Sequence, residues 1–237
     1  MKSILSFIFA SLTIFQIEAQ LFTKERVLNN ENFDKPLLSY GYYLGLNSYD
    51  FNIDYNSNVK DIQVIKSMGF NVGLIGNIRI NDYFDIRLEP GLVMSNRTLS
   101  YSGTYFEGLI YEEKDLEREI RSTYIHIPLL IKISTKRINN IKPFVVCGIS
   151  TALNLSSNQD NPEDNSQGNF RLVKNNLFYE LGIGVDLYLT WFKFTPSLRG
   201  IFSIKDEHIK DFDLNSPWTK NISQMQTRGI FVNFTFQ

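Results

Sequence analysis

The sequence predicts an all-β fold, an antiparallel transmembrane β-barrel of about eight strands and of the outer-membrane type. Three observations predict it. The chain begins with an apolar export signal, about eight later segments alternate hydrophobic and polar residues, and the connections between these segments alternate in length. Aromatic residues make up 14% of the chain, with 19 Phe and 12 Tyr, which suits the aromatic girdles of such barrels.

Residues 1–19 are predicted to be a cleaved signal peptide. Lys2 supplies the positive charge, an apolar run extends from Ile4 to Ile17, and Ala19 precedes the expected cleavage site. The alternative is a membrane-anchor helix. That alternative is disfavoured because an apolar run of roughly 14 residues is shorter than the roughly 20 needed to span a bilayer. We therefore expect a protein exported to the cell outer membrane.

The remainder divides into an extension and a barrel. Residues 20–38 are expected to be a periplasmic N-terminal extension with little structure of its own, because the segment is mostly polar and lacks periodicity, and residues 39–237 form the barrel. After the signal, no run of 18 or more apolar residues appears, which excludes an α-helical membrane protein. The predicted strands are 39–47, 68–80, 83–94, 122–134, 142–153, 179–189, 191–202 and 228–236.

Long polar connections alternate strictly with short turns. The long ones are 48–67, 95–121, 154–176 and 203–227, and the short ones are 81–82, 135–141 and a turn near 190. Outer-membrane barrels show this alternation because short turns face the periplasm and long loops face outside. Alternating hydrophobicity alone does not say which face is inside, so a secreted soluble barrel is the competing fold. The signal peptide and the loop asymmetry favour lipid contact for the Ile, Leu and Phe face.

The opposite face of the strands carries charges. A barrel of about eight strands has an interior just wide enough for side chains, and buried charges must pair. Five positive and four negative residues would then form a salt-bridged plug, the alternative being a narrow polar conduit or small-ligand site. The predicted lumen charge network is Arg79, Asp85, Arg87, Glu89, Lys132, Glu180, Asp186, Lys193 and Arg199.

No catalytic, cofactor-binding or metal site is predicted. The two histidines stand apart: His126 is expected on the inner face as a structural residue, and His208 in the last long loop as a solvated one. Asp50, Asp54 and Asp61 in the first long loop could bind a cation, although loop carboxylates are more often solvated. The net charge of −1 gives no reason to expect nucleic-acid binding.

Three segments resemble known families. The stretch Ser39–Tyr55, SYGYYLGLNSYDFNIDY, resembles the start of the PorT/SprT proteins, which are outer-membrane components of type IX secretion and of gliding motility. The segments YIHIPLLIK (Tyr124–Lys132) and LGIGVDLYL (Leu181–Leu189) are similar to the wider outer-membrane β-barrel family, although His126 replaces a residue that is acidic or polar in many members.

The resemblance implies a non-catalytic role in the export or maturation of secreted proteins. It implies the other type IX components as partners, whereas the predicted barrel itself is expected to contact outer-membrane lipid or lipopolysaccharide. Two further functions are compatible with the sequence: a stand-alone barrel for adhesion or for passage or binding of a small solute, and a lipid-modifying enzyme, for which no catalytic motif is present.

Overall fold

The structure is a computed structural model that describes residues 28–237 except 60, 162 and 164. The predicted signal peptide, and residues 20–27 of the predicted extension, lie outside the described residues.

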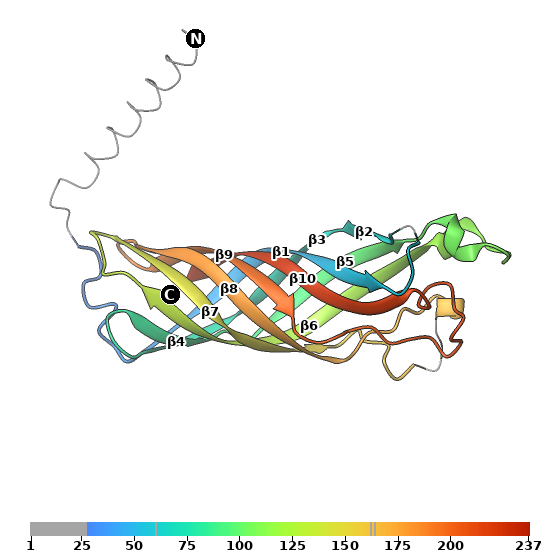
Figure 1. The fold of residues 1–237 in the computed structure, drawn as a ribbon. Coiled ribbons are helices and arrows are strands. Elements are labelled where there is room, and N and C mark those ends of the chain that lie inside the picture. Colours follow the sequence, from blue (N-terminus) through green and yellow to red (C-terminus); the bar gives the residue numbers. More distant parts are fainter. Residues whose placement is uncertain (1–27, 60, 162, 164) are drawn as a thin grey trace, which may run out of the picture.

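One antiparallel sheet closes on itself, because β1 pairs with both β10 and β3. Only one residue separates β2 from β3, and only two residues separate β4 from β5. Each of these pairs therefore acts as one continuous strand, and the barrel wall consists of eight strands. Figure 1 shows how they are arranged. The predicted all-β barrel is confirmed. The strands are β1 (Leu38–Tyr55), β2 (Gln63–Lys66), β3 (Met68–Arg79), β4 (Phe84–Leu88), β5 (Gly91–Ser100), β6 (Glu117–Ser134), β7 (Ile141–Asn154), β8 (Asn175–Tyr188), β9 (Lys193–Ser203) and β10 (Ile222–Phe236).

The register tilts the strands strongly. A row of paired residues that starts at Asp50 on β1 passes once around the barrel and returns to β1 at Tyr40, ten residues earlier. A closed sheet with such a displacement must tilt its strands relative to the barrel axis. Figure 1 shows the strands crossing the body of the molecule obliquely.

The connections separate by length between the two ends of the barrel. Short turns at 80–83, 135–140 and 189–192 form one end, here named the short-turn end. Connections at 56–62, 101–116, 155–174 and 204–221 form the opposite long-loop end (Figure 1). Among their described residues, the long connections contain three 3-10 turns: η1 (Gly103–Phe106), η2 (Glu113–Leu116) and η3 (Asn165–Gln167). Among the described residues, no helix combines the length and hydrophobicity needed to cross a membrane.

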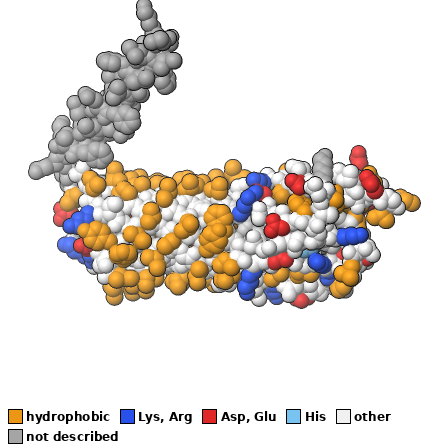
Figure 2. All heavy atoms as spheres, in the orientation of Figure 1, with side chains coloured by type: hydrophobic (Ala, Val, Ile, Leu, Met, Phe, Trp, Pro, Cys, Tyr) orange, Lys and Arg blue, Asp and Glu red, His pale blue; other side chains and the backbone are white. Residues whose placement is uncertain are grey.

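An apolar belt surrounds the barrel next to the short-turn end. Three of its outward side chains, Leu44, Leu129 and Ile183, are each at least half exposed. Figure 2 shows hydrophobic side chains covering the middle of the barrel, with charged side chains spread over the long-loop half and a further group at the short-turn end. A continuous apolar surface of this extent is foreign to proteins surrounded by water and is normal for a surface that faces lipid.

Beyond the belt, the chemical polarity of the strands reverses. On β1, the outward residues change from leucines to Asp50, Asn52 and Asp54, while Tyr49 and Phe51 are buried inside. The strands therefore continue past the belt as a barrel whose outer surface is polar and whose interior is apolar, the arrangement expected in water. This continuation explains why β1 reaches Tyr55, well past the end predicted at residue 47.

Candidate functional site

The lumen is filled by side chains in layers along the barrel axis. The lower ionic cluster, nearest the short-turn end, is built around Lys132 and Asp186, both about 1% exposed. The Lys132 ammonium donates to Oδ2 of Asp186 over 2.5 Å, and it lies 4.2 Å from the centre of the Phe144 ring. The hydroxyl of Thr195 donates to Oδ1 of Asp186 over 2.8 Å. Both carboxylate oxygens thus have partners, as a buried charge requires.

Residues 28–37 of the predicted extension form turns and bends that lie against this mouth of the barrel, and Leu38, its last residue, begins β1. The Tyr188 hydroxyl donates to the carboxylate of Asp34, and the Lys142 ammonium lies 3.7 Å from the same carboxylate. The Lys193 ammonium lies 4.7 Å from the centre of the Phe33 ring. The polar cavity left between this segment and the lower ionic cluster measures about 20 Å³, room for about one water molecule.

The middle ionic cluster forms the next layer. Arg199 bridges two carboxylates, lying 2.6 Å from Glu89 and 3.1 Å from Glu180. Glu89 also lies 3.3 Å from Arg87, and Nε2 of His126 lies 2.9 Å from Glu180. All five side chains are at most 5% exposed. Two guanidinium groups therefore face two carboxylates, and their formal charges balance without solvent.

Above these clusters the lumen becomes aromatic. The rings of Tyr49 and Phe231 meet edge to face at 5.4 Å. Arg97, fully buried, stacks 3.8 Å from the centre of the Phe51 ring and donates to the Thr227 hydroxyl over 3.0 Å. The guanidinium is therefore held by ring faces and hydroxyls, a favourable setting for a weakly hydrated cation.

The long connections close the outer mouth with a second apolar core. Phe106 is 2% exposed, and its ring lies 5.4 Å from that of Trp218, which comes from a different connection. Glu207 folds inward and accepts a 2.8 Å hydrogen bond from Thr227, and burial raises the pKa of its carboxyl group. Side chains therefore fill the barrel from the short-turn mouth to the long-loop mouth.

His208 differs from its predicted solvated position. It is 9% exposed and packs beside Phe170, with 6.2 Å between the ring centres. Burial lowers the pKa of His208 to about 4, so the imidazole is neutral at pH 7. The prediction was wrong because the last connection folds back over the barrel mouth. His126 occupies the inner face, where alternation had placed it.

The structure buries eight of the nine charged residues predicted to line the lumen, each at most 8% exposed. The exception is Arg79, whose side chain is 31% exposed at the short-turn rim and pairs with Asp82. The eight are Asp85, Arg87, Glu89, Lys132, Glu180, Asp186, Lys193 and Arg199.

Sequence reasoning missed Arg97 and Glu207 because both were assigned to loops. Arg97 and Leu99 share the inner face of β5 beyond the predicted strand end at residue 94, and the period of two that joins them to Val93 was the available signal.

The three aspartates considered for a cation site do not form one. Asp50 and Asp54 lie on β1 rather than in a loop, and Asp50 is paired with Lys66 and Arg228. Asp61 is exposed in the connection that follows. Within the part of the chain that the structure describes, no group of three or more His, Cys, Asp and Glu side chains is arranged to hold a metal ion.

The family of the chain follows from its sequence match. The family model described as "Outer membrane protein beta-barrel domain" matches residues 19–208, most of the chain. The chain belongs to this family. It is an outer-membrane β-barrel, and the apolar belt is its lipid-facing surface. Among curated proteins, no sequence matches the chain.

Solved outer-membrane barrels have a similar fold. The outer membrane protein OprG from Pseudomonas aeruginosa is 12% identical with a TM-score of 0.46, and the match covers 84% of this chain and 93% of OprG. Neisserial surface protein A is 9% identical with a TM-score of 0.45, covering 84% and 97%. Ail from Yersinia pestis is 11% identical with a TM-score of 0.38, covering 83% and 96%. At these values, the likeness does not extend beyond the barrel fold.

Proposed function

We propose that this outer-membrane barrel is a non-catalytic, protein-binding component of the type IX secretion system, acting in the export or maturation of surface proteins and in gliding where the cell glides. The filled lumen carries the proposal. A barrel whose interior is occupied by paired charges and packed rings acts through its outer surfaces rather than by conducting a solute. The resemblance of Ser39–Tyr55 to the PorT/SprT proteins supports the narrower assignment to secretion.

The long-loop end offers a contact surface for a protein. In the connection between β5 and β6, Leu109 is 56% exposed, Ile110 is fully exposed and Tyr111 is 42% exposed. We name these three residues the apolar tip. Consecutive apolar residues in water are unfavourable unless a partner covers them. Glu112, Glu113 and Lys114 follow the tip directly, and the Glu112 carboxylate lies 2.8 Å from the Lys114 ammonium. The three residues keep a net charge of −1, so a suitable partner would present an apolar pocket with a basic residue at its rim.

The apolar tip is held in place by the second core. Phe106 is buried just before it, and the Phe106 and Tyr111 rings lie 5.1 Å apart. Gly108 has a φ of +83°, which permits the turn between them. The indole N–H of Trp218 donates to the carbonyl of Asp115 over 2.9 Å just after the tip. A tip fixed before binding loses little conformational entropy on association, which favours a recognition role.

The surroundings of the histidines support a non-catalytic role. His126 is 1% exposed and is enclosed by the middle ionic cluster, and His208 is buried beneath the long connections. A general base must reach its substrate, and these two imidazoles are closed off from solvent.

The alternative function is a stand-alone barrel for adhesion or ligand binding. The apolar tip favours adhesion as much as it favours secretion, because both need a surface that contacts another macromolecule. Passage of a small solute is disfavoured by the packed lumen.

The test compares the secreted proteins of a deletion strain with those of strains complemented by variants. Deletion should block surface delivery of many proteins at once, and a Leu109→Ser/Ile110→Ser variant should fail to restore it. The matched control is Leu214→Ser, which removes a 74% exposed apolar residue from another long connection and should restore delivery. Unchanged secretion after deletion would refute the secretion role, and a loss of attachment with intact secretion would favour adhesion. A changed lipid A mass spectrum would point to an enzyme.

A further inference from the structure

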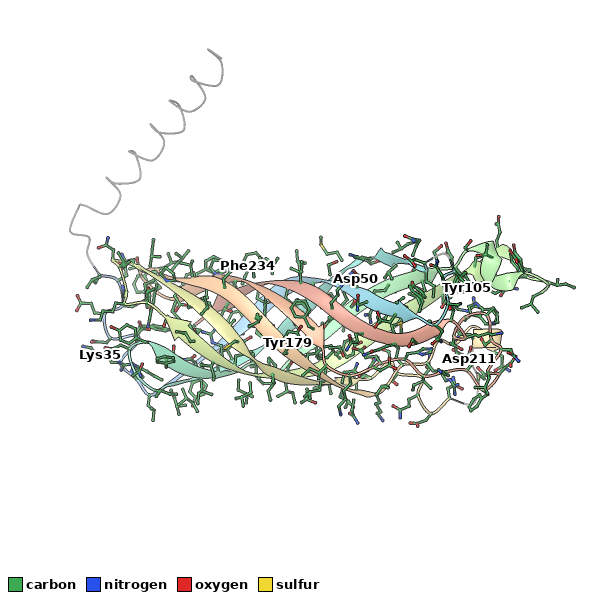
Figure 3. All side chains as sticks on the ribbon, viewed as in Figure 1. Lys35, Asp50, Tyr105, Tyr179, Asp211 and Phe234 are labelled. Atoms are coloured by element: carbon green, nitrogen blue, oxygen red, sulfur yellow. The ribbon has the colours of Figure 1, made fainter. Side chains whose placement is uncertain are left out.

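Two cations converge on one carboxylate where the apolar belt ends. The Lys66 ammonium on β2 and the Arg228 guanidinium on β10 each lie 2.9 Å from Oδ2 of Asp50 on β1. Figure 3 labels Asp50 partway along the barrel, and Figure 2 shows charged side chains beginning beyond the belt in the same region. We name these three residues the border triad.

The geometry of the border triad suits a phosphate group. Because both nitrogens lie 2.9 Å from a single oxygen atom, they are separated by at most about 6 Å. One phosphate can accept hydrogen bonds from two donors at that spacing. Asp50 is only 13% exposed, whereas the side chains of Lys66 and Arg228 are 50% and 52% exposed. The carboxylate therefore lies beneath and positions two cations that face outward, and the triad keeps a net charge of +1.

The position of the border triad decides what surrounds it. In the neighbouring row toward the short-turn end, Met68 is 76% exposed and Ile230 is 59% exposed. In the neighbouring outward-facing row toward the long-loop end, Asn52 pairs with Gln226. The triad is thus the first charged row above side chains that contact acyl chains. Because long loops face the cell exterior in outer-membrane barrels, this row lies at the level of the outer-leaflet headgroups.

We propose that Lys66 and Arg228 clamp a phosphate group of an outer-leaflet glycolipid of the lipopolysaccharide class, with its acyl chains lying against Met68 and Ile230. An anionic phosphate complements the net positive charge, and the apolar row below complements the lipid chains. Asp50 acts as a positioning residue that holds the two cations at bridging distance. The proposal does not depend on the role in secretion.

The test uses the purified full-length barrel in detergent micelles and native mass spectrometry with three probes: phosphorylated lipid A, lipid A with its phosphates removed, and inorganic phosphate. The Lys66→Gln/Arg228→Gln variant should bind phosphorylated lipid A about thirtyfold more weakly, the loss expected for two interfacial cations. The wild-type barrel should bind dephosphorylated lipid A as weakly as this variant binds the phosphorylated form.

Two further variants control for charge and folding. Lys174→Gln/Lys210→Gln removes two exposed cations from the long connections and should bind like the wild type. Lys66→Arg/Arg228→Lys keeps both charges and should retain most of the binding of phosphorylated lipid A. For every variant, a shift in gel mobility between heated and unheated samples would show that the barrel is folded. Equal binding of the two lipid A forms, or unchanged binding by the Gln variant, would overturn the clamp. Displacement of lipid A by inorganic phosphate at equal concentration would overturn the assignment to a lipid.

Discussion

Replacing Lys132 by Met tests whether the lumen is as dry as its packing implies. Met keeps the length of the side chain over Phe144 but removes the ammonium group that lies 2.5 Å from Asp186. The Asp186 carboxylate would keep its hydrogen bond from Thr195 and lose its principal countercharge. Breaking a buried pair on one side typically costs about 3–5 kcal/mol, and the exposures of 2% and 1% place this pair in that class.

The double variant Lys132→Met/Asp186→Leu should recover to within about 1 kcal/mol of the wild type, because it also removes the buried carboxylate that the single variant leaves without its principal countercharge. The measurement is the free energy of unfolding from urea titrations of the barrel in lipid vesicles, extrapolated linearly to zero denaturant. Ile131→Met, at the neighbouring lipid-facing position, is the control and should change stability by less than about 1 kcal/mol. If Lys132→Met costs less than about 1 kcal/mol, water reaches the pair and the lumen is not filled by packed side chains.

Three other outcomes are expected. Gly45→Ala should destabilise the barrel by about 1–3 kcal/mol, because the added methyl carbon would lie 2.2 Å from Oδ1 of Asn233, whereas Gly76→Ala has open space and should be nearly neutral in the same urea titration. Acid should destabilise the packed long connections that close the outer mouth. Burial lowers the pKa of His208 to about 4 in the folded protein, below the ordinary value of about 6.5. The neutral imidazole therefore contributes roughly 3 kcal/mol to the free energy of unfolding above pH 6.5, and this contribution is lost as the pH falls toward about 4. Limited proteolysis should therefore cleave the long connections faster as the pH falls across this range, and His208→Gln should weaken this pH dependence. Equal cleavage of the wild type at pH 7 and pH 4.5 would contradict the prediction. Purified barrels in planar bilayers should give no conductance steps, and regular steps from the wild type would show an open lumen.

Alternation located each strand near the short-turn end, and it also located the long-loop ends of β7 and β9 to within one residue. It missed the long-loop ends of β1, β5, β6, β8 and β10. Within the belt, apolar residues face outward and polar residues face inward. A strand predicted from that pattern ends where the pattern reverses, although the strand itself continues. β1 was therefore predicted to end at residue 47 rather than Tyr55, and β10 to begin at 228 rather than Ile222. The period of two continues across the border, and only the solvent on the outside changes from lipid to water.

The candidate site was predictable as a set of inward charges but not as pairs. Arg199 reaches Glu89, 110 residues earlier in the chain, because tilt and register bring β9 opposite the residues that follow β4. No local pattern in the sequence encodes that distance. The cap over the outer mouth was missed for a different reason, since residues such as Phe106 and Trp218 lie in connections without periodicity and become buried only when the connections pack together.

The reversal of polarity along the strands also sets how deeply the barrel sits in the membrane. A shift toward the periplasm would draw Asp50 and its cationic neighbours among acyl chains, and a shift outward would bring Leu46 and Ile230 into water. Both displacements raise the free energy, so the boundary between the apolar belt and the border triad holds the barrel at a fixed depth in the membrane. The apolar tip is consequently carried at a constant height above the headgroups, so a partner of the kind proposed above would meet it in one plane.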